Sequence, residues 1–183
     1  ATLHFGFRHA ARARSLCVAG CGYGAEQGQR EKFRAEADAI AASLDAQGMP
    51  AFAERYAYGP TRVQFENKDP RGFAHFVQML SEHSAIGHSL TMINLQARRP
   101  TLYEMEADLK AFKPPLLVIV GDEDDWCVDA SIYLRRTVPT AGLMVIPRSG
   151  HTITSEEPDK FNAALAELFA DAEAGRWLAH KPA

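Results

Sequence analysis

The stretch PLLVIVGDEDD, residues 115–125, decides the fold class. It joins an uninterrupted apolar run to a glycine and four consecutive acids. Apolar runs without alternation are typical of strands that are buried on both faces of a parallel sheet. Two other runs have the same character, ARSLCVAG at 13–20 and GLMVIP at 142–147. The sequence therefore predicts an α/β protein whose mostly parallel sheet is flanked by helices.

Helical patterns lie between and after these strands. The sequence predicts a short helix over residues 1–9 and another over residues 129–137, between the second and third strands. Beyond the third strand, Thr154 and Glu157 have the spacing of a capping box, and Pro158 suits the first turn of a final helix. This order of strands and helices predicts right-handed crossovers.

The residues between the first and second strands have a different character. Residues 26–108 contain helical patterns around 30–47 and 70–96, with no convincing buried strand. We expect them to form an inserted helical cap over the carboxyl edge of the sheet, where open α/β sheets hold their sites. The flanking residues, 1–25 and 109–183, then form the core domain.

Composition excludes several classes of partner. The hydrophobic fraction of 46% and the charged fraction of 23% are those of a globular domain, and the net charge of −3 argues against nucleic-acid or anionic-membrane surfaces. Cys17, Cys21 and Cys127 make an odd count without regular spacing, which favours a reducing compartment and a cytoplasmic location. The composition leaves open whether the chain forms a homo-oligomer. Residues 180–183 are expected to be a frayed tail.

The ends of the second and third strands carry candidate catalytic groups. Four acids in succession are costly to bury, so we expect one carboxylate to turn inward and the others to face solvent. The third strand runs into Gly150-His151, and Asp124 lies 27 residues before His151, the length of one loop, helix and strand. A carboxylate on one ring nitrogen fixes the tautomer and leaves the other nitrogen as a general base.

Three segments resemble the α/β-hydrolase family. LVIVGDED at 117–124 resembles its acid strand, in which Gly-x-x-Asp places the acid at Asp124. VIPRSGH at 145–151, followed by the acids and proline of 156–158, resembles its histidine strand and last helix. Residues 1–9 resemble the helix after the nucleophile elbow. The resemblance implies the C-terminal two-thirds of an α/β-hydrolase, with the acid and histidine of the triad in the family's order.

The same resemblance places the nucleophile outside this chain. The elbow Gly-x-Ser-x-Gly and the oxyanion-hole amides are expected before Ala1. Residues 87–91, GHSLT, begin like an elbow but lack its final glycine and lie in a helical stretch, so Ser89 is interpreted as a serine of the cap. We expect the isolated chain to be inactive. We also expect the N-terminal part of the same domain to pack on its apolar strands, as a partner that it needs.

The resemblance implies a carboxylic-ester hydrolase that uses a Ser-Asp-His triad, with Asp124 and His151 as the acid and the base. It implies neither a cofactor nor a metal. Trp126 and Cys127, beside the acid, are candidates for the substrate pocket. The substrate is expected to be small, apolar and ester-like, because the cap is rich in aromatic side chains that could offer apolar surface, namely Phe52, Tyr56, Tyr58, Phe65, Phe73 and Phe76.

Three other functions remain open. An aspartate at the elbow would indicate an epoxide hydrolase or a dehalogenase. A serine in a pocket of different polarity could cleave carbon–carbon bonds. A hydrolase-like scaffold could also serve as a binding protein without turnover.

Overall fold

The chain folds into two compact units. The computed structural model describes residues 1–180. One unit, the core unit, combines Ala1–Gly22 with the chain from Glu104 onward, and the other, the helical unit, is Tyr23–Tyr103. The first core segment ends at residue 22, three residues before the predicted end at 25. The helical unit ends at residue 103, five residues before the predicted end at 108.

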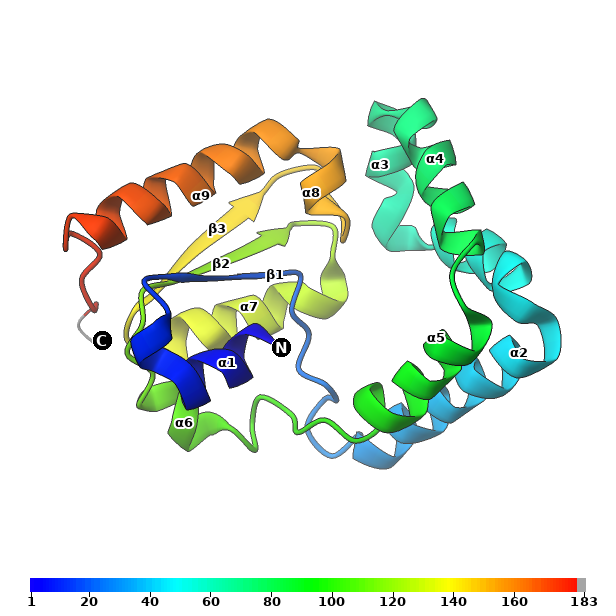
Figure 1. The fold of residues 1–183 in the computed structure, drawn as a ribbon, viewed down its shortest axis with the longest axis horizontal. Coiled ribbons are helices and arrows are strands. Elements are labelled where there is room, and N and C mark those ends of the chain that lie inside the picture. The colour runs from blue at the N-terminus through cyan, green and yellow to red at the C-terminus, as the bar shows by residue number, and fades with distance from the viewer. Residues whose placement is uncertain (181–183) are drawn as a thin grey trace. The chain divides into compact units, whose positions relative to one another are not determined.

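The core unit contains a parallel sheet of three strands in the order β1-β2-β3 (Figure 1). The strands are β1 (Leu16–Ala19), β2 (Leu116–Gly121) and β3 (Ala141–Ile146). Leu116 is in register with Leu16 on one side and with Ala141 on the other. All six residues of β2 are buried, as expected for a central strand that lacks alternation. The α/β class and the parallel sheet are confirmed.

Helices cover both faces of this sheet (Figure 1). Helix α9 (Pro158–Glu173) lies on one face, while α1 (Thr2–His9) and α7 (Asp125–Thr137) lie on the other. The α9 face holds a continuous apolar cluster, in which the buried members are Leu117, Ile119, Ile146, Ile153 and Leu168. This core fixes the strand ends that carry the candidate site.

The prediction for the start of the last helix is wrong. A separate short helix, α8 (Ile153–Glu156), precedes α9, so Thr154 is not its N-cap. The backbone of Glu157 caps α9 without a side-chain hydrogen bond, although Pro158 does occupy the first turn as predicted. The cause lies in Glu156, whose buried carboxylate is turned back toward the loop before α8.

Other elements of the core unit also depart from the pattern. Helix α7 begins at Asp125, four residues earlier than predicted, and α6 (Glu106–Lys110) precedes β2. His180 is held, because its amide donates to the carbonyl of Pro139. It is therefore not frayed, and the rest of the predicted tail lies outside the described residues. No helix in the described part of the chain combines the length and the apolar character that crossing a bilayer requires.

The described residues of the helical unit form no strand. Its helices are α2 (Arg30–Ala57), α3 (Val63–Lys68), α4 (Pro70–Ser81) and α5 (Ala85–Thr91), followed by a π-helical segment, Met92–Gln96. Helix α2 is kinked at Gly48, where φ is 74° and ψ is 178°. Asp69 caps α4 and Ser84 caps α5, each by accepting a hydrogen bond from the amide three residues on.

The phenylalanines of the helical unit have a structural role that the sequence analysis did not assign. Phe52, Phe65 and Phe73 are buried in two clusters within the unit and do not offer apolar surface. Tyr56 and Tyr58 are exposed. A helical unit of this size needs a core of its own, and its largest apolar side chains supply it. Whether the unit covers the strand ends stays a prediction.

Candidate active site

Asp124 is positioned by the turn that follows β2. Its amide donates to the carbonyl of Gly121 at 3.2 Å, and its own carbonyl accepts from the amide of Cys127 at 2.7 Å, which starts α7. Its side chain is buried, whereas Asp122 and Asp125 are exposed. The expectation that one acid of the four turns inward therefore holds for Asp124.

His151 is held by a loop with unusual backbone geometry and a buried carboxylate. Arg148, at the start of the loop, has φ of 56°, the left-handed region that non-glycine residues rarely adopt. The amide of Gly150 donates to Oε2 of Glu156 at 2.9 Å, and Thr152 Oγ1 donates to Oε1 of the same side chain at 3.3 Å. Glu156 thus accepts hydrogen bonds from the residues on both sides of His151.

Asp124 and His151 are in direct contact. Nδ1 of His151 lies 2.7 Å from Oδ2 of Asp124. Because an ionised carboxylate can only accept, Nδ1 carries the proton in this hydrogen bond, and the neutral ring keeps its lone pair on Nε2. The side chain of His151 is 37% exposed, so the ring can be reached from solvent. The predicted contact between the two residues is present.

The turn after β1 packs against this pair. Gly20 has φ of 57°, and a Cβ placed on it would lie 3.1 Å from Cε1 and 3.2 Å from Nδ1 of His151. Its amide also donates to the carbonyl of Ile119 in β2. A glycine is required here on both counts, the backbone conformation and the close approach. The carboxyl ends of all three strands therefore meet around one imidazole.

The two predicted pocket residues lie in very different surroundings. Cys127 is buried, and its sulfur is 3.9 Å from Nδ1 of His151. Trp126 is 72% exposed. The turn after β1 also approaches both residues, because a Cβ on Gly22 would lie 3.3 Å from the carbonyl oxygen of Trp126 and 3.9 Å from the sulfur of Cys127. A role for either residue in binding substrate stays a prediction.

Sequence reasoning missed two residues of the site, Glu156 and Gly20. Glu156 was part of a quoted motif but had no role, although an acid that follows a Gly-His step by a few residues can reach back to the amides of that loop. Gly20 ends the apolar run at 13–20 and had no assigned role. Its approach to His151 depends on the register of β1 with β2, which the sequence does not reveal.

Neither Ser89 nor Cys17 is a candidate nucleophile for His151. Ser89 lies within α5, in the helical unit, and does not follow a strand, so the elbow interpretation has no structural support. Cys17 lies in β1, and burial raises the pKa of its thiol to about 11, so it is protonated at neutral pH. Cys17, Cys21 and Cys127 form no disulfide with one another.

Solved structures with the same arrangement of elements identify the fold. The chain superposes on MenH from S. aureus with a TM-score of 0.85 at 19% identity, over 94% of this chain and 64% of that one. The chain has the α/β-hydrolase fold. A thermophilic esterase from Thermogutta terrifontis matches with a TM-score of 0.78 at 21% identity, over 93% of this chain and 60% of that one.

A third hydrolase-fold structure, the enol-lactonase from Burkholderia xenovorans LB400, matches with a TM-score of 0.73 at 16% identity, over 92% of this chain and 61% of that one. The chain thus spans about three-fifths of the length of these structures. No protein-family model and no curated protein matches the sequence. At these identities the matches establish the hydrolase fold, and the chemistry must be argued from the site.

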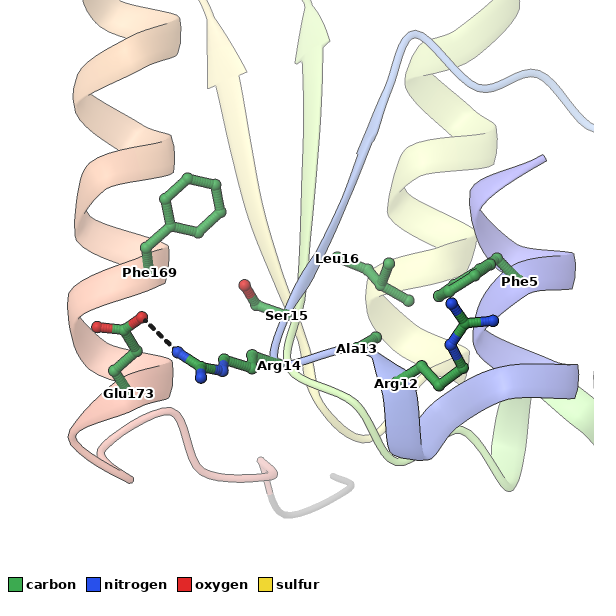
Figure 2. Close-up of a pocket in the computed structure, with 8 residues that line it drawn as sticks. All are labelled: Phe5, Arg12, Ala13, Arg14, Ser15, Leu16, Phe169 and Glu173. Carbon is green, nitrogen blue, oxygen red and sulfur yellow. Dashed lines mark hydrogen bonds and ion pairs between the residues drawn. The ribbon is translucent and has the colours of Figure 1, made fainter.

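A pocket of the hydrolase core lies at the opposite end of β1 from this site. It has a volume of about 320 Å³ and includes Phe5 of α1, Leu16 of β1 and Phe169 of α9, with an ion pair between Arg14 and Glu173 at its rim (Figure 2). None of the four predicted site residues lines it. We therefore do not assign it to the chemistry of Asp124 and His151.

Replacing Glu156 by glutamine should weaken the loop that carries His151. The loss of a charge-assisted acceptor for two donors in a buried position is expected to reduce the free energy of unfolding by about 1 to 3 kcal/mol. The measurement is urea unfolding of the full-length protein. Glu167→Gln is the matched control, because Glu167 is an exposed acid of α9, where removal of one surface charge contributes little to stability. Equal stability of the two variants would contradict the role given to Glu156.

Proposed function

We propose that this chain supplies the general base and the orienting acid of a carboxylic-ester hydrolase. The observation that carries the proposal is the contact between Nδ1 of His151 and Oδ2 of Asp124 at 2.7 Å. It fixes the proton on Nδ1 and leaves the lone pair of Nε2 available, which is the state that a general base requires. The arrangement lies at the carboxyl ends of the strands, where sites of this fold class form.

The proposed reaction needs a nucleophile that residues 1–180 do not supply in this arrangement. A serine hydroxyl from the N-terminal part of the same domain would attack the ester carbonyl, and Nε2 of His151 would take the hydroxyl proton. The resulting imidazolium is stabilised by the carboxylate of Asp124, and it returns the proton to the leaving alkoxide. In the second half, His151 takes a proton from water as the water attacks the acyl-enzyme ester, and it then gives that proton to the departing serine oxygen.

The free edge of β1 is where this N-terminal part would join the sheet. Within the described residues, β1 pairs with β2 alone, so its outer edge has unpaired backbone groups. Such an edge is stabilised when another strand covers it. The proposed partner therefore completes the sheet at β1 and brings the nucleophile to the end of the sheet that holds His151.

The substrate class is proposed as a carboxylic ester or lactone of small size. This is supported by the similar structures, which include an esterase, an enol-lactonase and an enzyme that degrades an N-acyl homoserine lactone. A buried carboxylate and an imidazole are also two of the three side chains of the triad that carries out acyl transfer.

A fluorophosphonate probe on the full-length protein tests this function. We expect one labelled serine, and we expect His151→Gln to slow labelling by about 10²- to 10⁴-fold, because an unassisted hydroxyl is a weak nucleophile. His75→Gln, an exposed histidine of α4, is the matched control and should label at the wild-type rate. Absence of labelling, together with absence of turnover of aryl esters, would overturn the proposal.

A further inference from the structure

We propose that Asp124, Cys127 and His151 together bind a thiophilic divalent cation such as Zn²⁺, and that capture of this ion switches off the base. The regulatory part rests on the proposed function, whereas the binding itself does not. Oxygen, sulfur and ring nitrogen of these three side chains lie within 4.8 Å of one another. Two of the residues are buried and the third is half-buried. They offer the three types of donor that zinc prefers in proteins.

The three donor atoms are near enough to reach one ion after their side chains rotate. Bond lengths of about 2.0 to 2.3 Å place two ligands of a tetrahedral zinc ion about 3.4 to 3.6 Å apart. The sulfur of Cys127 lies 3.9 Å from Nδ1 of His151, and Oδ2 of Asp124 lies 2.7 Å from the same nitrogen. To bind the ion, the carboxylate of Asp124 must swing by roughly 2 Å out of the hydrogen-bond line of Nδ1, because the ion takes that position. The sulfur of Cys127 must also approach the carboxylate oxygen, since the three donor atoms now lie as far apart as 4.8 Å at most. Side-chain rotations can provide such shifts.

The charges also balance. A carboxylate, a thiolate and a neutral imidazole neutralise a divalent ion, so the buried site carries no net charge once it is filled. Cys127 lies in the first turn of α7, where the helix N-terminus favours a negatively charged side chain. Water completes the fourth position, reached past the exposed edge of the imidazole of His151.

Binding changes the tautomer of the ring. The ion takes the position of the proton on Nδ1, that proton is carried on Nε2 in the metal-bound neutral ring, and the thiol proton leaves to solvent. One proton is therefore released for each ion bound. With its lone pair on Nδ1 committed to the metal and a proton on Nε2, His151 can no longer accept the proton of a nucleophile. The ion thus acts as an inhibitor of the base and not as a cofactor.

Titration of the full-length protein with Cd²⁺ tests the binding site. We expect a saturable thiolate-to-metal charge-transfer absorption, and an affinity at least about 100-fold weaker in Cys127→Ser. Cys17→Ser is the matched control, since Cys17 lies on β1 and packs on the α9 face. An absorption that does not saturate with Cd²⁺ would overturn the proposal, because it would show that there is no thiolate site. An unchanged absorption in Cys127→Ser would overturn it as well, because the metal would then bind to a different thiolate.

A second measurement covers the case in which Cys127→Ser does not fold. In the wild-type protein, nitrogen–proton correlation spectra of His151 should move from the Nδ1–H to the Nε2–H tautomer as Cd²⁺ is added. A ring that keeps its Nδ1 proton at saturating metal contradicts the proposal. Fluorophosphonate labelling with and without Zn²⁺ separates the two hypotheses, because metal binding without any labelled serine refutes the hydrolase function alone.

Discussion

Replacing Asp124 by asparagine should lower kcat/KM for ester hydrolysis by about 10⁴-fold in the full-length protein, with little change in fold. The amide can donate to Nδ1 or accept from it, so the ring is no longer held with its proton on Nδ1. A neutral His151 then populates the tautomer with the proton on Nε2, which cannot act as a base. The imidazolium that forms during attack also loses the neighbouring negative charge.

Asp125→Asn is the matched control for this experiment. Asp125 is the next residue in the chain and carries the same group, but it is exposed. Its replacement should leave kcat/KM within about twofold of the wild-type value, as expected for a surface charge. If Asp125→Asn causes the larger loss, or if Asp124→Asn keeps a tenth of the activity, the acid of the pair has been misassigned.

Gly121→Ala should be among the most damaging substitutions of a single methyl group in this chain. A Cβ on Gly121 would collide with the carbonyl oxygens of Ser149 and Gly150, which are backbone atoms and cannot rotate away. We expect a loss of about 2 to 3 kcal/mol in the free energy of unfolding. The loop that carries His151 must move to accept the methyl group, so hydrolysis should fall as well.

Gly87→Ala provides the comparison, because it makes the same change in a helix. A Cβ on Gly87 would meet only Ser84, at an ordinary contact distance of 3.4 Å. Alanine has the higher helix propensity, so this variant should be as stable as the wild type or slightly more stable. Urea unfolding of both variants is the measurement. A Gly121→Ala protein with wild-type stability would show that the loop yields without cost.

The sequence predicted the parts of the site that depend on strand ends. The apolar runs before Asp124 and His151 locate the carboxyl edge of the sheet, and a spacing of one crossover brings both residues to it. It did not predict the contact of Cys127 with the ring. Helix α7 begins at Asp125, directly after the acid, whereas the pattern favoured a start at 129. Only the early start places Cys127 one turn beyond Asp124, on the same side.

Long-range packing accounts for the other differences. Thr154 and Glu157 have the spacing of a capping box. The carboxylate of Glu156 instead accepts two hydrogen bonds from the loop that carries His151. The chain therefore forms the separate helix α8, and the last helix begins at Pro158. The phenylalanines of the helical unit were expected to offer apolar surface. Their burial depends on contacts between helices that are distant in sequence, which local patterns do not report.

The register of the sheet also sets an order for folding. Leu116 in β2 pairs with Ala141 in β3 across 25 residues, but it pairs with Leu16 in β1 across 100 residues. Closing the longer loop as an unstructured chain costs about 1.2 kcal/mol more in entropy than closing the shorter one. The β2-β3 pair should therefore form early, with α7 as its crossover.

The addition of β1 then depends on the helical unit, because its residues make up most of the longer loop. A folded unit brings Tyr23 and Tyr103, which stack with their ring centroids 4.7 Å apart, together and so shortens the distance that the chain must close. If the residues of the helical unit fold first, the effective chain separation between β1 and β2 becomes much shorter, and the pairing of the two strands is expected to be faster. The helical unit supplies no strand to the sheet. A substitution that destabilises this unit should nevertheless slow the pairing of β1 with β2.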